Sequence, residues 1–192
     1  MKRRTFDLIL TAVGAVLTVG LLIAGSLLLW GASFTTSSVH DQLAKQEIFF
    51  PAAGSAEAMN PAIGQCVRDN AGQQLLTGAQ AECYANHFIA VHLSEMPYGG
   101  VYSKVSAAAM ADPNNASLKA LELTVFQGTT LRGLLLEAYA FSVFGMIATI
   151  SAIAAFVGAF LLLIATILGF LHYRKTPDDV EFPKPVSAPE AA

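Results

Sequence analysis

Two long runs of apolar positions dominate the pattern of the chain. The first extends from Leu8 to Trp30 without a charged residue, directly after MKRR. It matches the ~20 apolar residues needed to cross a bilayer core. A secretory signal peptide is the alternative, since the small residues GAS follow at 31–33, but its apolar region covers only ~7 to 15 residues. The pattern therefore predicts an uncleaved transmembrane helix at 8–31, after a cytoplasmic segment at 1–7.

The second run, from Ala138 to Tyr173, contains no acidic residue, lysine or arginine. At ~1.5 Å per residue, a continuous helix of this length exceeds a ~30 Å hydrocarbon core. We therefore expect a helix that begins outside the membrane, around Thr129, and enters it near Phe141 or Phe144. Residues 138–173 are assigned to this helix, which includes the second transmembrane segment.

The region between the two runs, residues 32–137, shows helical patterns broken by proline and glycine and no convincing strand alternation. A first helix ends at Pro51, a second is capped by Thr77 and stopped by MPYGG, and VYSKVSAAAMA forms a short third. The expected fold is an all-α membrane protein, with two transmembrane helices in a hairpin and a small helical extracytoplasmic cap between them. The proline-containing tail at 174–192 is expected to be a disordered cytoplasmic extension.

The distribution of charge predicts the orientation. Clustered lysine and arginine flank only the outer ends of the two runs, in MKRR and HYRK. The positive-inside rule therefore places both termini in the cytoplasm of a multi-pass plasma-membrane protein. A content of 54% hydrophobic and 13% charged residues fits this class, and a net charge of -3 gives no basic face for nucleic acid. The lipid bilayer is the expected partner, with a protein partner or a homo-oligomer as further options.

The stretch CYANHFIAVHL, residues 83–93, is the candidate for metal chemistry. On an ideal helix Cys83 and His87 share one face, whereas His92 lies with Tyr84 and Phe88 on another. Such a stripe is typical of a packed histidine with one satisfied hydrogen bond. A closed zinc site needs four ligands, and Cys83 with His87 supplies two. We therefore expect no metal and no cofactor.

The two cysteines of the chain are better explained as a pair. If Cys66 were a third metal ligand, the spacing would be C-x16-C-x3-H, which lacks a close CxxC pair. Two lone cysteines outside the membrane usually form a disulfide. A Cys66–Cys83 disulfide is therefore predicted, and a metal site or free thiols remain the alternatives.

Small residues form stripes on both apolar runs. Because lipid is as apolar as leucine, transmembrane helices associate through the close packing that small residues permit. We expect these stripes to meet within one chain and to leave Phe156, Phe160 and Leu163 facing lipid or a partner; the alternative pairs the second stripe with its copy in an oligomer. The stripes consist of Gly14, Thr18 and Gly25 on the first run, and Gly145, Ala148, Ala152, Ala155 and Ala159 on the second.

Three blocks, QEIFFPAAGS, AGQQLLTGAQAECYANHFIAVHL and TLRGLLLEAYAF, resemble the external segments of an actinobacterial family of two-span membrane proteins often labelled aromatic ring-opening dioxygenase. The resemblance implies fold and location but no functional residues. Non-haem iron oxygenases bind iron through two histidines and a carboxylate on one face. Here His87 and His92 diverge and His40 lies far upstream, and no catalytic motif such as GxSxG or HExxH occurs. We therefore expect no enzymatic activity and no catalytic residues.

Two functional hypotheses remain. The first is a structural or accessory protein of a membrane or cell-envelope complex. The alternative is a module that binds a lipid or small apolar ligand at the outer membrane surface. A closed, small cap favours the first, whereas exposed apolar surface that leads to the apolar runs favours the second.

Overall fold

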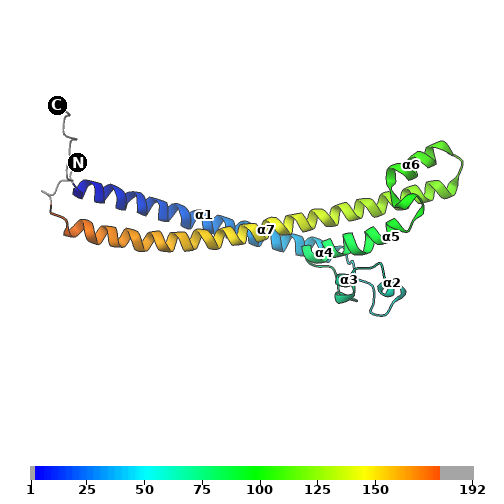
Figure 1. Ribbon diagram of the computed structural model, residues 1–192, viewed down its shortest axis with the longest axis horizontal. Helices are drawn as coiled ribbons and strands as arrows, with labels where there is room; N and C mark the ends of the chain where they lie inside the picture. Colours follow the sequence, from blue (N-terminus) through cyan, green and yellow to red (C-terminus); the bar gives the residue numbers. More distant parts are fainter. Residues whose placement is uncertain (1–2, 178–192) are drawn as a thin grey trace, which may run out of the picture. The chain divides into compact units, whose positions relative to one another are not determined.

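A computed structural model describes residues 3–177 of the chain, and these residues fold into helices and connecting loops (Figure 1). The described part contains no β-strand, only an isolated antiparallel bridge between Phe49 and Gln74. Two helices, α1 (Arg3–Lys45) and α7 (Ala116–Lys175), are long and apolar enough to cross a membrane. The predicted all-α class and the two apolar helices are thus confirmed.

The longest helix, α7, begins earlier than expected. It starts at Ala116 rather than near Thr129 and continues without interruption for 60 residues. The side-chain oxygen of Asn115 accepts a hydrogen bond from the N–H of Leu118 at 3.2 Å, which satisfies one of the free donors of the first turn. No proline follows before Lys175, so nothing breaks the helix. The helix also includes Arg174 and Lys175, which were assigned to the tail; the remaining tail prediction, at 178–192, lies outside the described residues.

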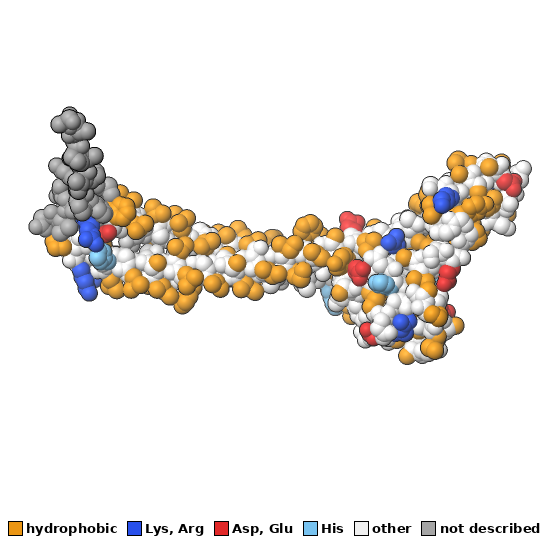
Figure 2. Space-filling model, in the orientation of Figure 1, with side chains coloured by type: hydrophobic (Ala, Val, Ile, Leu, Met, Phe, Trp, Pro, Cys, Tyr) orange, Lys and Arg blue, Asp and Glu red, His pale blue; other side chains and the backbone are white. Residues whose placement is uncertain are grey.

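The chain divides into two compact units. The first, here called the helix-pair unit, comprises residues 3–30 of α1 and described residues 148–177, which include the rest of α7 up to Lys175. The two segments run antiparallel, because Gly14 lies against Thr166 while Gly25 lies against Phe156. Hydrophobic side chains are exposed along the visible face of this pair (Figure 2).

Burial in the helix-pair unit follows a seven-residue repeat. Thr18 and Gly25 on α1, and Ala152 and Ala159 on α7, are buried, whereas most residues around them are exposed. A repeat of 3.5 residues keeps one seam of each helix against the other and is typical of left-handed helix packing. The seam is made largely of small residues.

The second unit, residues 31–147, has a hydrophobic core and is called the cored unit here. Thr77 caps its central helix as predicted: its hydroxyl accepts from the Gln80 N–H at 3.2 Å, and the Gln80 side chain accepts from the Thr77 N–H at 3.1 Å. Besides the end of α1 and the start of α7, the unit contains α2 (Ala56–Met59), α3 (Gln65–Asp69), α4 (Gly78–Tyr84), the π-helix η1 (Ala85–Ile89), α5 (Ala90–Ser94), the 3-10 helix η2 (Pro97–Gly100) and α6 (Tyr102–Ala111).

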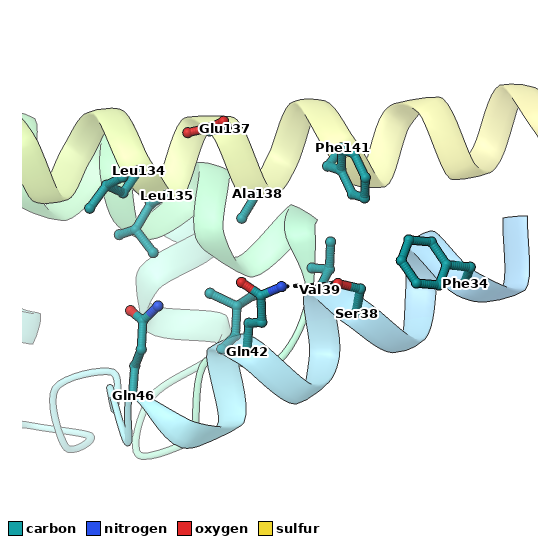
Figure 3. Close-up of a pocket in the computed structure, with 11 residues that line it drawn as sticks. Phe34, Ser38, Val39, Gln42, Gln46, Leu134, Leu135, Glu137, Ala138 and Phe141 are labelled. Atoms are coloured by element: carbon teal, nitrogen blue, oxygen red, sulfur yellow. Dashed lines mark hydrogen bonds between the residues drawn. The ribbon is translucent and has the colours of Figure 1, made fainter. Parts of the chain in front are cut away.

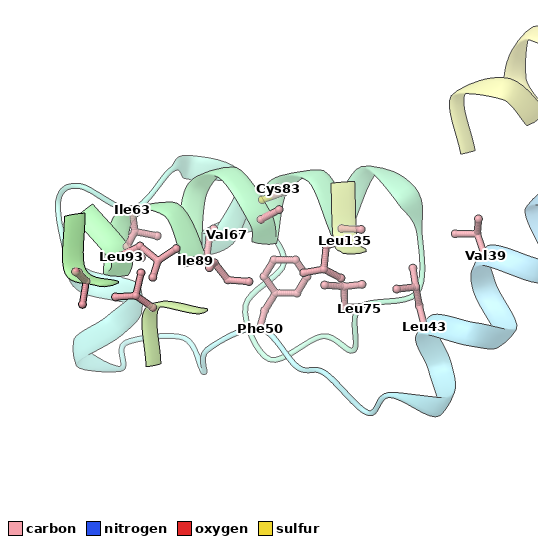
Figure 4. Packing of buried hydrophobic residues seen from close by; sticks show 14 residues of the cluster. Val39, Leu43, Phe50, Ile63, Val67, Leu75, Cys83, Ile89, Leu93 and Leu135 are labelled. Carbon is pink, nitrogen blue, oxygen red and sulfur yellow. The ribbon is translucent and has the colours of Figure 1, made fainter. Parts of the chain in front are cut away.

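The core of this unit gathers apolar side chains from loops and helices around the helical segment 78–94 (Figure 4). Ile63, Val67 and Leu75 are fully or almost fully buried, and Leu135 of α7 closes the cluster. The Phe50 and Tyr84 rings meet edge to face at 5.3 Å between centroids, a favourable aromatic arrangement. This packing attaches the segment between α1 and α7 to both long helices.

Candidate functional site

A groove of about 410 Å³ lies in the cored unit between the last turns of α1 and the middle of α7 (Figure 3). Its volume falls within the ~300–1,000 Å³ typical of small-molecule sites. It is the candidate site of this chain. The residues that line it are Phe34, Ser38, Val39, Gln42, Leu43, Gln46, Leu134, Leu135, Glu137, Ala138 and Phe141.

The groove arises from short side chains between longer ones. On α1, Val39 and Leu43 turn into the core and are buried. Ser38 lies between the larger residues of the wall, and Ala138 faces the groove from α7. These two short side chains cannot fill the space between the helices, so a cavity remains open along them.

The groove has aromatic rings at one end and polar side chains along α1, with Leu134 and Leu135 of α7 opposite Gln46 (Figure 3). Phe34 and Phe141 lie at one end, and Gln46 lies at the other, with Ser38 and Gln42 between them (Figure 3). The Gln42 amide donates a hydrogen bond to the Ser38 hydroxyl at 3.0 Å. Among residues 3–177, Glu137 is the one charged residue that lines the groove. The site therefore matches an amphipathic molecule, with an apolar part beside the rings and a polar part beside the amides.

Large apolar side chains at the groove remain accessible. Phe34 is 56% exposed, Leu134 58% and Phe141 41%. Phe141 belongs to the second apolar run, and Phe34 follows the first by four residues. Within the cored unit the groove is thus bordered by exposed apolar side chains, and such a surface marks a ligand or partner site.

A smaller groove of about 300 Å³ lies between α5 and α7 and includes His92 in its wall. Nδ1 of His92 lies 2.8 Å from the Phe88 carbonyl oxygen, and a carbonyl only accepts, so Nδ1 donates. The His92 ring also packs on Phe88, with 4.4 Å between centroids. The predicted packed histidine with one hydrogen bond is therefore present. It lies in α5, directly after a π-helix at Ala85–Ile89 that the sequence pattern did not reveal.

One titratable group near His92 has a shifted pKa. The pKa of Glu57 is lowered from its ordinary value, first by hydrogen bonding to its own backbone N–H, then by the Ser55 hydroxyl, and to a smaller extent by His92. The side chain is fully exposed, so this shift does not indicate a reactive carboxylate.

The residues considered for a metal do not converge. Cys66 and Cys83 lie at disulfide distance, with sulfur atoms 2.02 Å apart, which agrees with the predicted pairing. His87 lies over Gly64 at the start of α3, and Nδ1 of His40 lies 3.3 Å from the carboxylate of its sequence neighbour Asp41. Within residues 3–177, no three histidine, cysteine, aspartate or glutamate side chains form a metal-binding group.

The small residues of the two long helices are brought together in part. In the helix-pair unit a Cβ on Gly14 would lie 2.6 Å from the Thr166 hydroxyl, and one on Gly25 would lie 3.1 Å from the Phe156 ring. Thr18, Ala152 and Ala159 are buried in the same unit, whereas Ala148 and Ala155 are half-buried.

One part of the packing prediction is wrong. Phe156 does not face outward but lies across Gly25 and is half-buried. Phe160 and Leu163 are exposed as expected, at 62% and 44%. In the cored unit, Gly145 approaches Thr35, with 2.8 Å from a Cβ position to the hydroxyl. A glycine on one helix thus accommodates a larger side chain of the other, instead of meeting a second small residue.

A polar chain that sequence reasoning missed links the central helical segment to α7. Arg132 donates to the side-chain oxygen of Asn86 at 2.9 Å, and the Asn86 amide donates to Glu82 at 2.8 Å. Arg132 and Asn86 are 46 residues apart in sequence, and no local pattern signals that they pair.

The comparisons with known proteins give no further guidance, because no protein family, curated protein or solved structure matches the chain.

Proposed function

We propose that the chain is a two-span plasma-membrane protein, with both termini in the cytoplasm and most of the cored unit outside. The uncharged runs Leu8–Trp30 and Ala138–Tyr173 support two membrane crossings, and the basic residues beside them support the orientation. The large apolar side chains exposed in the helix-pair unit, such as Val16 at 73% and Leu27 at 63%, suit lipid as the surrounding solvent. The resemblance to actinobacterial two-span proteins stays part of this proposal.

Within this arrangement the cored unit binds an amphipathic lipid with one acyl chain at the outer surface of the bilayer and performs no chemistry on it. The observation that carries this proposal is the groove, whose aromatic end adjoins the apolar runs and whose amide end leads away from them. Of the two functions that the sequence left open, the exposed apolar surface at Phe34, Leu134 and Phe141 favours ligand binding.

The energetics fit a role in receiving a lipid rather than in holding it permanently. Removing each methylene from water contributes about 0.8 kcal/mol, so ten methylenes correspond to roughly micromolar affinity before the cost of association. A lipid that comes from the bilayer is already in apolar surroundings and gains much less. The groove therefore exchanges its ligand readily with the membrane.

A photoactivatable acyl probe in phospholipid vesicles tests this proposal with the full chain. The probe should label peptides that contain 34–46 and 134–141. Gln42→Trp adds an indole at an exposed position of the groove and should lower this labelling at least about fivefold. Ser37→Trp adds the same indole at an exposed position of α1 that does not line the groove, and it should leave the labelling unchanged. Labelling that is uniform over both long helices, or that is equal in the two variants, would contradict a binding groove.

An accessory role in a complex is the second candidate, because the cored unit exposes further apolar side chains away from the groove. These include Met110 at 72%, Leu123 at 57% and Phe126 at 51%. Rings of Tyr102 and Phe126 lie 5.6 Å apart between α6 and α7. Cross-linking in intact cells from position 126 to a defined second protein, lost in Leu123→Ser, would favour this role; its absence would leave ligand binding as the only function proposed.

A further inference from the structure

The polar side chains of the groove determine which lipid fits it. Since the acyl chain gains little on leaving one apolar environment for another, discrimination must come from the headgroup. Four polar side chains line the groove, namely Ser38, Gln42, Gln46 and Glu137. Their hydrogen-bonding capacity and charge therefore define the class of ligand.

The hydrogen-bonding capacity of these side chains favours a headgroup that can donate hydrogen bonds. The Ser38 hydroxyl and the two glutamine amides can both donate and accept, but the Glu137 carboxylate only accepts. An ionised phosphate headgroup also only accepts, so it cannot form a hydrogen bond with Glu137. A glycerol hydroxyl donates and accepts, so it can pair with Glu137 of α7 as well as with the three polar side chains between residues 38 and 46.

The charges around the groove also disfavour an anionic headgroup. In the part of the chain that the structure describes, no charged residue other than Glu137 lines the groove. The neighbouring charges on α1, Asp41 and Lys45, are of opposite sign four residues apart, and Arg132 of α7 donates to Asn86 instead. Across residues 31–147 there are nine carboxylates and five lysine or arginine side chains. An anionic headgroup is therefore repelled both by Glu137 and by the unit as a whole.

A quaternary ammonium headgroup also lacks a suitable site. Such a cation binds best against aromatic faces. Phe34 and Phe141 lie at the opposite end of the groove from Gln46 (Figure 3). We propose that the groove binds a single-chain lipid with an uncharged, hydroxyl-bearing headgroup, such as a monoacylglycerol; this inference rests on the proposed function.

Competition against the acyl photoprobe provides the test, with the full chain in phosphatidylcholine vesicles. The competitors are monopalmitoylglycerol, lysophosphatidylcholine and lysophosphatidylglycerol, all with the same acyl chain. Monopalmitoylglycerol should compete at least about fivefold better than lysophosphatidylglycerol, because one like-charge contact at an exposed site corresponds to roughly this factor. The difference should shrink in high salt.

Two variants identify the source of the preference. Glu137→Gln removes the charge and retains the shape, so lysophosphatidylglycerol should then compete within about twofold of the neutral lipid. Glu122→Gln is the matched control, because Glu122 lies on the same helix outside the groove and its substitution should leave the preference unchanged. Lysophosphatidylcholine, which keeps a phosphate, should compete less well than monopalmitoylglycerol in the unmodified chain.

The outcomes separate this inference from the function on which it rests. Equal competition by the neutral and anionic lipids, or a preference that Glu137→Gln does not change, would overturn the headgroup assignment while acyl binding in the groove stands. Labelling that no lipid displaces and that Gln42→Trp does not reduce would overturn the groove function, and the headgroup assignment with it.

Discussion

At the scale of single residues, glycines decide where the helices approach most closely. A Cβ on Gly78 would overlap Cβ of Ser142 and would lie 3.3 Å from Cα of Tyr139. Neither atom belongs to a flexible side-chain end, so the first turn of α4 can rest on α7 only because residue 78 has no side chain. Gly133, on α7 itself, has nothing within 4 Å of its Cβ position.

Replacing each of these two glycines with alanine should change the free energy of unfolding in opposite directions. Gly78→Ala forces α4 away from α7 and should reduce the free energy of unfolding by about 1–3 kcal/mol. Gly133→Ala removes backbone freedom from an exposed helix position and should raise it by about 0.5–1 kcal/mol. Thermal unfolding in mild detergent, followed by circular dichroism, compares them; equal midpoints would contradict the close contact at Gly78.

Tyr84 should make the free energy of unfolding depend on pH in the alkaline range. Burial raises the pKa of its phenol above 10.0, so the folded chain retains this proton at pH values where the unfolded chain has lost it. The free energy of unfolding should therefore decline as pH rises from about 10 through the folded pKa. The slope should be smaller in Tyr84→Phe, measured by denaturant unfolding between pH 9 and 11; identical slopes would exclude a contribution from Tyr84.

At the scale of helices, periodicity predicted the elements better than their contacts. The apolar runs and the Thr77 cap were visible because they are local patterns. The early start of α7 was not, because residues 116–137 mix polar and apolar positions without a clear break. The groove also escaped prediction, since it requires the pairing of Ser38 with Ala138, 100 residues apart, and no property of either residue signals its partner.

The register of α1 against α7 can be tested with engineered cysteines. A Cβ on Gly14 would lie 3.7 Å from Cβ of Thr166, within the ~3.5–4.5 Å of disulfides. Gly14→Cys with Thr166→Cys should therefore oxidise within the monomer. Gly14→Cys with Ala152→Cys should not, because Ala152 lies about 21 Å further along α7. Non-reducing gels and intact mass distinguish the products, and crosslinks found only in dimers would contradict packing within one chain.

The Cys66–Cys83 disulfide, which links α3 to α4, should contribute strongly to the stability of the cored unit. Closing the loop between Cys66 and Cys83, 17 residues apart, should stabilise by about 3 kcal/mol. The intact mass should be about 2 daltons below that of the fully reduced chain, and Cys66→Ser should lower the unfolding temperature. Stoichiometric zinc or iron that is lost in Cys83→Ser would contradict the disulfide and restore the metal hypothesis.

At the scale of the whole molecule, the two units differ in how they hide apolar surface. The cored unit buries Ile63, Val67 and Leu75 as a water-soluble domain does, whereas the helix-pair unit buries mainly small residues and exposes large ones. This contrast follows from the sequence, because exposing long uncharged runs to water costs free energy. The proposed membrane topology accounts for both kinds of surface in one chain.

Labelling in intact cells tests that topology. Ala53→Cys lies on an exposed loop before α2 and should react with a membrane-impermeant thiol reagent if the cored unit is outside. Ser187→Cys should be protected until the cells are permeabilised, since the basic residues at HYRK favour a cytoplasmic C-terminus. The native cysteines, held in a disulfide, should contribute no label. Reaction at both positions before permeabilisation would require the two termini to lie on opposite sides or the chain to cross only once.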